Sequence, residues 1–176
     1  MRDTVTFLQI EALMRELGRR VREPARVYFV GGTTAVMFGW RASTIDIDVR
    51  LEPDRAILAH IPELKRELRL NIELASPADF VPELPGWEAR SIFIAQHGLV
   101  TFLHYDFYGQ ILAKIERGFE QDLSDADAMA RGGHFEANRL LELFRAVEGE
   151  FIRFPAIDHA RLGQKVRDFC GRRGGS

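Results

Sequence analysis

A glycine pair and two closely spaced aspartates stand in one short stretch of this chain, and they constrain its fold more than any other feature. The stretch is Val27–Leu51, VYFVGGTTAVMFGWRASTIDIDVRL. Gly31 and Gly32 follow an apolar run, and Asp46 and Asp48 come later with one isoleucine between them. Glycine backbone that another group can approach closely and paired carboxylates together indicate a site for bound phosphate and metal.

The residues around the glycines predict a strand, then backbone that another group can approach closely, and then a short helix. Residues 26–30 are mostly apolar and β-branched or aromatic, which is typical of a buried strand. Thr33 or Thr34 is expected to cap a helix that runs through Phe38 and ends at Gly39. The free N–H groups at the start of that helix favour an anion. The candidate anion-binding residues are Gly31, Gly32 and Thr33.

The two aspartates are expected to share one face of a strand. Extended structure beginning at Thr44 would put Asp46 and Asp48 on that face, roughly 7 Å apart, because side chains alternate along a strand. The opposite face would carry Ile45, Ile47 and Val49. Two like charges repel each other and resist burial, whereas Mg²⁺ is commonly held by one or two carboxylates together with substrate phosphates. The alternative is an exposed edge strand whose solvent face carries two acids.

Gly31-Gly32 followed by Asp46-Ile47-Asp48 resembles the signature of the DNA polymerase β-like nucleotidyltransferase superfamily. The resemblance implies a small mixed sheet flanked by helices and Mg²⁺ on the two aspartates, with two ions when a nucleoside triphosphate is bound. It also implies transfer of a nucleotidyl group from that triphosphate. The serine usual at the second position of the pair is Gly32 here, so backbone N–H groups would have to contact the phosphate.

The same resemblance implies a third carboxylate on a later strand. A helix is expected from Asp54 to about Arg69, and residues 70–74 then read as a strand, which makes Glu73 the first candidate for a third metal ligand. Asp79 is the rival, although an acid after Ser-Pro is also typical of the first turn of a helix.

The second half of the chain predicts a hairpin and then helices. Ser91–Gln96 and Leu99–Tyr105 are extended runs joined by His97-Gly98, and Asp106 is expected to cap the helix that follows. The expected fold class is α/β (α+β), with a mixed sheet of the nucleotidyltransferase type flanked by helices. The expected division is a core of residues 1–105 and a helical C-terminal portion of residues 106–176 packed on it, ending in a frayed tail at 172–176.

Lys114, followed by Asp122 and Asp125, resembles the Lys-then-Asp helical motif of AbiEii-type nucleotidyltransferase toxins and related small prokaryotic proteins. By that resemblance Lys114 contacts the triphosphate, and Asp122 or Asp125 orders the site from the helical side. The alternative is an ordinary amphipathic helix in which Lys114 pairs with Glu116 or Asp122 on a solvated face. The candidate catalytic residues are Asp46, Asp48, Glu73 and Lys114.

The composition indicates a cytoplasmic protein that does not enter a membrane. Cys170 is the only cysteine, which excludes an internal disulfide. No apolar run approaches the ~20 residues of a membrane span, and no signal-peptide pattern is visible. The net charge of −2 gives no global electrostatic case for nucleic acid, although the helix expected over residues 4–21 has a basic face. The five histidines lack metal-ligand spacing.

These patterns predict a Mg²⁺-dependent nucleotidyltransferase that uses a nucleoside triphosphate and modifies a hydroxyl of RNA or protein. Similarity to the toxins suggests the end of a transfer RNA or a protein hydroxyl as acceptor, and an antitoxin protein as partner. Two hypotheses from other classes stay open. The first is a catalytically silent nucleotide-binding module, and the second is an interaction subunit on the same scaffold.

Overall fold

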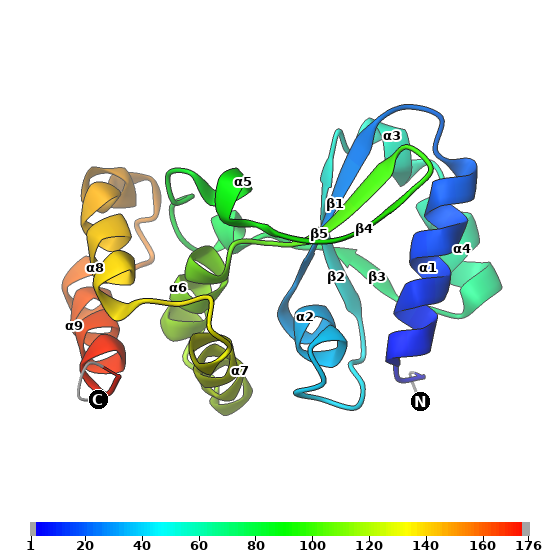
Figure 1. Cartoon of the computed structure of the whole chain (residues 1–176). Coiled ribbons are helices and arrows are strands. Elements are labelled where there is room, and N and C mark those ends of the chain that lie inside the picture. The colour runs from blue at the N-terminus through cyan, green and yellow to red at the C-terminus, as the bar shows by residue number, and fades with distance from the viewer. Residues whose placement is uncertain (1–2, 174–176) are drawn as a thin grey trace. The chain divides into compact units, whose positions relative to one another are not determined.

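The computed structural model describes residues 3–173 and divides the chain into two compact units (Figure 1). The sheet unit comprises Met1–Ser76 and Ser91–Tyr105, and the helical unit comprises Pro77–Arg90 and Asp106–Ser176. Residues 77–90 therefore belong to the helical unit, although they precede the hairpin of the sheet unit in the sequence. The last three residues of the expected frayed tail, 174–176, lie outside the described residues.

Five strands form one mixed sheet in the described part of the sheet unit, in the order β3-β2-β1-β5-β4. The strands are β1 (Ala25–Val30), β2 (Ile47–Glu52), β3 (Ile72–Leu74), β4 (Ile92–His97) and β5 (Val100–His104). β1 runs antiparallel to β2 and parallel to β5, β2 runs parallel to β3, and β4 and β5 form the predicted hairpin. A mixed sheet with flanking helices and a helical C-terminal part confirms the predicted α/β (α+β) class.

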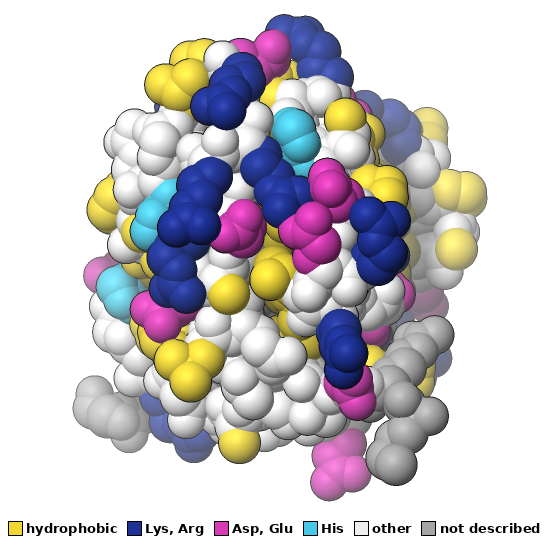
Figure 2. Space-filling view, turned by 90° about the vertical axis from the view of Figure 1, so that its right-hand side faces the viewer, with side chains coloured by type: hydrophobic (Ala, Val, Ile, Leu, Met, Phe, Trp, Pro, Cys, Tyr) yellow, Lys and Arg dark blue, Asp and Glu magenta, His cyan; other side chains and the backbone are white. Residues whose placement is uncertain are grey.

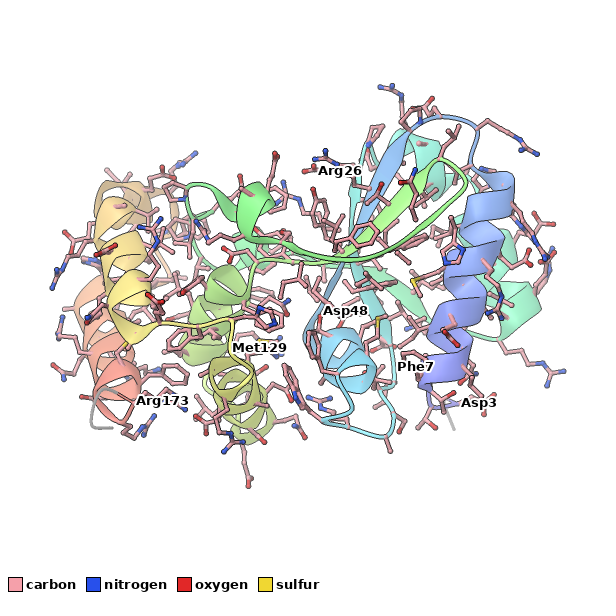
Figure 3. All side chains as sticks on the ribbon, viewed as in Figure 1. Asp3, Phe7, Arg26, Asp48, Met129 and Arg173 are labelled. Atoms are coloured by element: carbon pink, nitrogen blue, oxygen red, sulfur yellow. The ribbon has the colours of Figure 1, made fainter. Side chains whose placement is uncertain are left out.

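The two faces of the sheet differ in chemistry. One face is apolar and is covered by α1 (Phe7–Arg20), α2 (Gly31–Met37), α3 (Arg55–Leu58) and α4 (Ile61–Leu68). Its buried strand residues include Val27, Phe29, Ile47, Val49 and Phe102. Along β2 these alternate with half-buried polar residues, so Asp48 lies on the face opposite the helix-covered core. Figure 3 shows Asp48 beside α2.

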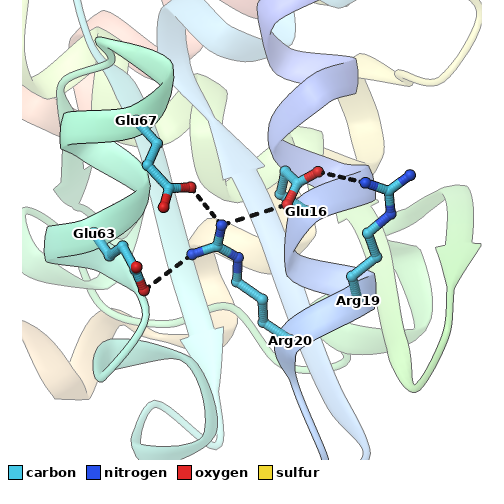
Figure 4. A network of polar contacts seen from close by, with 5 residues as sticks. All are labelled: Glu16, Arg19, Arg20, Glu63 and Glu67. Carbon is cyan, nitrogen blue, oxygen red and sulfur yellow. Dashed lines mark hydrogen bonds and ion pairs between the residues drawn. The ribbon is translucent and has the colours of Figure 1, made fainter.

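The basic face of α1 is paired with acids. Arg19 pairs with Glu16 at 2.9 Å, and Arg20 contacts Glu16 together with Glu63 and Glu67 of α4 (Figure 4). The hydrogen bond to Glu67 and the neighbouring carboxylates raise the pKa of Arg20. Figure 2 likewise shows basic and acidic side chains interspersed on the face that it views. Arg20 therefore connects α1 to α4, and acids interrupt the basic surface that the two arginines would otherwise offer to nucleic acid.

The prediction of a single helix from Asp54 to about Arg69 is wrong, because this segment forms two helices. α3 ends at Leu58 and α4 begins at Ile61, with Pro62 in the first turn of α4. A proline lacks the N–H that a continuous helix would need here, and its ring clashes with the carbonyl of the residue four positions before it. The side chain of Asp54 caps α3 by accepting a backbone N–H, as expected.

The described part of the helical unit consists of short helices. They are η1 (Pro77–Asp79), α5 (Trp87–Arg90), α6 (Phe107–Arg117), α7 (Glu120–Arg131), α8 (Ala137–Ala146), η2 (Glu148–Arg153) and α9 (His159–Gly171). Asp106 caps α6 by accepting from the N–H of Tyr108, as predicted. Arg90 donates to the same carboxylate through Nε and Nη2, at 3.1 and 2.7 Å. Among residues 3–173 no helix combines the length and apolar character needed to cross a membrane.

Candidate functional site

The glycine pair brings the end of β1 against a carboxylate of β2. Val30 pairs in register with Asp48, and Gly31 follows with a positive φ of 59°. A Cβ atom built on Gly31 would lie 3.2 Å from Asp48 Oδ2. Both the backbone conformation and this close approach favour glycine at position 31, because other residues rarely adopt such a φ. The first glycine and the second aspartate of the motif therefore lie together.

The threonines after the glycines do not cap the helix. α2 begins at Gly31 itself and has no side-chain cap, so the predicted capping role of Thr33 or Thr34 is wrong. Both threonines lie inside α2 and are buried. The Thr33 hydroxyl accepts from the backbone N–H of Asp48 at 3.0 Å. Thr33 thus holds the backbone of β2 at the position of Asp48.

Only one of the two aspartates lies in the strand. β2 starts at Ile47, so Asp46 lies in a bend just before it, and the strand predicted from Thr44 is wrong in its first residues. Thr44 instead forms an isolated bridge with Val5, through hydrogen bonds of 2.6 and 2.9 Å. The chain must bend after this bridge to join β2, which leaves Ile45 53% exposed instead of on the apolar face.

Glu73 lies beside Asp48 on the neighbouring strand. The two residues are register partners in the parallel pair of β2 and β3, so their side chains share a face of the sheet. Asn71 extends the group, because its Nδ2 donates to Asp46 Oδ1 and, at 3.0 Å, to Glu73 Oε1. Asp79, the rival third acid, lies in η1 of the helical unit and is exposed.

The donor set of this region fits a hard cation that is shared with a ligand. Among the described residues no three or more His, Cys, Asp or Glu side chains are grouped so that they could hold a metal ion. The available donors are carboxylate oxygens, which Mg²⁺ prefers, and Mg²⁺ usually needs only one or two of them when phosphate oxygens complete its shell. Asp46, Asp48 and Glu73 fit that mode of binding better than a metal site closed by protein alone.

Sequence reasoning missed two neighbours of the glycine pair, Arg41 and Thr44. A Cβ atom built on Gly32 would lie 2.5 Å from Thr44 Oγ1 and 3.1 Å from Arg41 Nη1. Both residues come from the segment between α2 and β2, and they fold back over α2. No local pattern indicates this approach, since it depends on the bridge between Thr44 and Val5.

His104, one of the histidines without metal-ligand spacing, is a packing residue of the sheet unit. Its ring is 4% exposed and lies against Phe38 at 4.6 Å between centroids. Its Nδ1 is 3.1 Å from the Thr34 hydroxyl, which also donates to the carbonyl of Phe29. Trp40 stacks on the same Phe38 at 4.8 Å. These contacts fix the C-terminal end of α2 on the sheet.

In the helical unit, Lys114 forms a buried charge cluster with acids of α7. Lys114 Nζ lies 3.2 Å from Asp125 Oδ2 and 3.6 Å from Asp122 Oδ1, and the three side chains are 8%, 4% and 10% exposed. Arg117 Nε approaches the other oxygen of Asp122 at 3.5 Å. The predicted pairing with Asp122 is therefore present, but the solvated face expected with it is not. Contact of Lys114 with a triphosphate stays a prediction.

Comparison with known protein families identifies the chain. Residues 5–153 match the model of a family described as nucleotidyltransferase of unknown function (DUF6036). Searches of curated proteins and of solved structures found no match. The family match spans most of the chain and includes the glycine pair together with Asp46, Asp48 and Glu73, so the protein belongs to this nucleotidyltransferase family.

Proposed function

We propose that the protein transfers a nucleotidyl group from a nucleoside triphosphate to a hydroxyl group in a Mg²⁺-dependent reaction. The observation that carries the proposal is the approach of the Asp48 carboxylate to Gly31, with Glu73 in register on the next strand. Two carboxylates on one sheet face, beside glycine backbone that carries no Cβ atom, suit a cation and a phosphate at the same place.

The roles proposed for the residues follow from their positions. Asp46 and Asp48 would hold Mg²⁺, and Glu73 would be the third acid because it shares the face of Asp48. Mg²⁺, when bound, would polarise the α-phosphate and offset the charge that develops on the leaving group. Thr33 would keep the backbone at Asp48 fixed through its hydroxyl. Gly31 would leave room for phosphate next to the carboxylate.

In the proposed reaction the acceptor hydroxyl oxygen forms a bond to the α-phosphorus. The bond from this phosphorus to the oxygen that bridges to the β-phosphate breaks, and pyrophosphate leaves. The hydroxyl proton passes to a carboxylate of the site or to water. Similarity to the toxins suggests the end of a transfer RNA or a protein hydroxyl as acceptor, and an antitoxin as partner.

Labelling with two forms of each triphosphate tests this function. The protein is incubated with Mg²⁺, total cell RNA or protein, and a triphosphate that is labelled either at the α- or at the γ-phosphate. We expect label in an acceptor from the α-labelled form only, whereas label from the γ-form would indicate phosphoryl transfer. Mg²⁺-dependent binding without labelling of any acceptor would identify a silent binding module instead.

Three variants connect the labelling to the site. Asp48→Asn is expected to abolish it, because the neutral amide is a poor ligand for Mg²⁺. Glu73→Gln should reduce it by at least about 100-fold if this carboxylate acts in the transition state, equivalent to ~2.7 kcal/mol. Asp79→Asn is the matched control and should retain wild-type labelling. Retention in Glu73→Gln and loss in Asp79→Asn would reverse the assignment of the third acid.

A further inference from the structure

The space above Gly32 is filled by two side chains from the segment that links α2 to β2. A Cβ atom at this position would lie 2.5 Å from Thr44 Oγ1, 3.2 Å from Thr44 Cβ and 3.1 Å from Arg41 Nη1. Real Cβ atoms do not approach a neighbour as closely as the first of these distances. Any larger residue at position 32 would therefore have to displace Thr44, so glycine is required here by its neighbours.

Both neighbours are held by backbone hydrogen bonds. Thr44 exchanges two of them with Val5, and the N–H of Arg41 donates to the carbonyl of Ala35 at 3.3 Å. Both side chains are half-buried, so the fold limits where the hydroxyl and the guanidinium can go. The two polar groups are thus positioned by the backbone over the second glycine of the motif.

A hydroxyl and a guanidinium in this place have the chemistry to bind phosphate. A guanidinium presents a planar set of N–H donors that matches the oxygens of a phosphate group, and hydrogen bonds to charged oxygens are the strong ones. Glycine at position 32 offers no hydroxyl, but Thr44 Oγ1 lies 2.5 Å from the point where a Cβ atom on residue 32 would be. Asp48 lies at the preceding glycine, which places acidic and basic groups at adjacent positions of the pair.

We propose that Arg41 and Thr44 bind the phosphate oxygens of the nucleoside triphosphate at Gly32, with the Thr44 hydroxyl supplying the contact that position 32 itself lacks. This inference rests on the proposed function, since it names further residues that hold the same substrate. Within the sheet unit, the guanidinium of Arg41 then supplies the positive charge that faces the phosphates.

Calorimetric titration with Mg²⁺ and each nucleoside triphosphate tests the two residues. Thr44→Val keeps the shape of the side chain and removes its hydroxyl, and we expect about 10-fold weaker binding of the triphosphate that wild type binds most tightly. Arg41→Gln should weaken binding by about 100-fold, and Arg41→Lys by less, because lysine keeps the charge and loses the planar fork. Arg55→Gln, on an exposed arginine that pairs with Glu23, is the control for loss of charge and should bind as wild type does.

Inorganic tripolyphosphate with Mg²⁺ is the second probe. It lacks the nucleoside, so the Arg41 and Thr44 variants should lose affinity for it by the same factors as for the triphosphate. Wild-type affinity of these variants for tripolyphosphate would show that the two residues do not bind phosphate, and it would overturn the inference.

A reciprocal exchange at Gly32 tests whether the hydroxyl itself matters. Gly32→Ser alone should bind poorly because its Cβ collides with Thr44. The double variant Gly32→Ser/Thr44→Ala removes the 2.5 Å contact with Oγ1, leaves only the milder contacts with Cβ of residue 44 and with Arg41, and moves a hydroxyl onto residue 32, so binding should return to within about threefold of wild type. Gly32→Ala/Thr44→Ala removes the same 2.5 Å contact, keeps the same milder ones and has no hydroxyl, so its binding should stay weak. Equal affinity of the two double variants would contradict the role of the hydroxyl.

The outcomes separate this inference from the function on which it rests. Wild-type protein that binds and transfers nucleotide, with Thr44→Val and Arg41→Gln unchanged, would overturn the inference and leave the proposed function intact. Wild-type protein that binds no triphosphate with Mg²⁺ would overturn both. Far-ultraviolet circular dichroism of each variant establishes that it is folded before its affinity is compared.

Discussion

Replacement of Gly18 by alanine should destabilise the protein, although the same change usually stabilises a helix. Gly18 lies in α1, where it meets the turn of the β4–β5 hairpin. A Cβ atom on it would lie 2.8 Å from both the carbonyl carbon and the oxygen of His97, and closer still to the Cβ atom of that residue. Gly98 has a φ of 57°, and a Cβ atom built on it would come equally close to the carbonyl oxygen of Gly18. The turn therefore packs directly on the backbone of α1.

Two opposing contributions set the size of the effect. Alanine in a helix interior is favoured over glycine by ~1 kcal/mol. Insertion of an atom into a tightly packed place costs ~1–3 kcal/mol, and the upper part of that range, ~2–3 kcal/mol, applies here because backbone atoms of the hairpin would have to move. We expect a net loss of ~1–2 kcal/mol. With a urea m value of ~2 kcal/mol/M, the unfolding midpoint should fall by ~0.5–1 M.

Urea unfolding followed by circular dichroism measures the effect, and Gly163→Ala is the matched control. Gly163 lies inside α9, and the nearest atom to its added Cβ is the flexible end of Arg167 at 3.3 Å. Alanine is accommodated there without backbone movement, so a gain of up to ~1 kcal/mol is expected. A Gly18→Ala protein as stable as wild type or more stable would refute the packing argument.

Three further predictions concern ionisable groups. Asp106→Ala removes one partner of the buried ion pair with Arg90 and also the cap of α6. It should reduce the free energy of unfolding, measured by thermal or urea unfolding, by ~3 kcal/mol or more. A loss of under about 1 kcal/mol would show that the pair adds nothing to stability. Burial raises the pKa of the Cys170 thiol to about 11, so it should react with a thiol reagent at pH 8 only after denaturation, and rapid reaction in the folded protein would contradict its burial. The protonated thiol is favoured by folding, so its contribution to stability is complete below the unfolded pKa and is lost as pH rises toward 11. Arg20→Gln should lower the melting temperature more in low salt than in high salt, because the acids around Arg20 act on it by screened electrostatics, and an effect independent of salt would point to packing instead.

Local patterns were sufficient for several elements of the fold. Alternation and β-branched content located β1 and the hairpin. The caps at Asp54 and Asp106 were recognised because each aspartate directly precedes a segment in which apolar residues recur at helical spacing. The helix broken at Pro62 was predicted as continuous because the apolar spacing persists across the proline. In that case the steric rule for proline outweighs the periodicity.

Long-range contacts account for the other differences. Thr33 reads as a cap from its place after two glycines, yet its hydroxyl is taken by the N–H of Asp48, fifteen residues away. The bend at Asp46 follows from the bridge between Thr44 and Val5, which joins the N-terminal segment to the motif. Neither partner can be identified from spacing within the motif, since each comes from a separate segment of the fold.

The same reasoning changes the meaning of glycine at position 32. In the sequence, glycine in place of the usual serine removes a hydroxyl from position 32, so that backbone N–H groups would have to contact the phosphate. In the structure, the Thr44 hydroxyl oxygen lies 2.5 Å and Arg41 Nη1 3.1 Å from the point where a Cβ atom on residue 32 would be. Glycine at 32 and threonine at 44 are therefore linked by packing, and neither substitution can be judged without the other. Activity should accordingly depend on a hydroxyl above the second glycine, whichever of the two residues provides it.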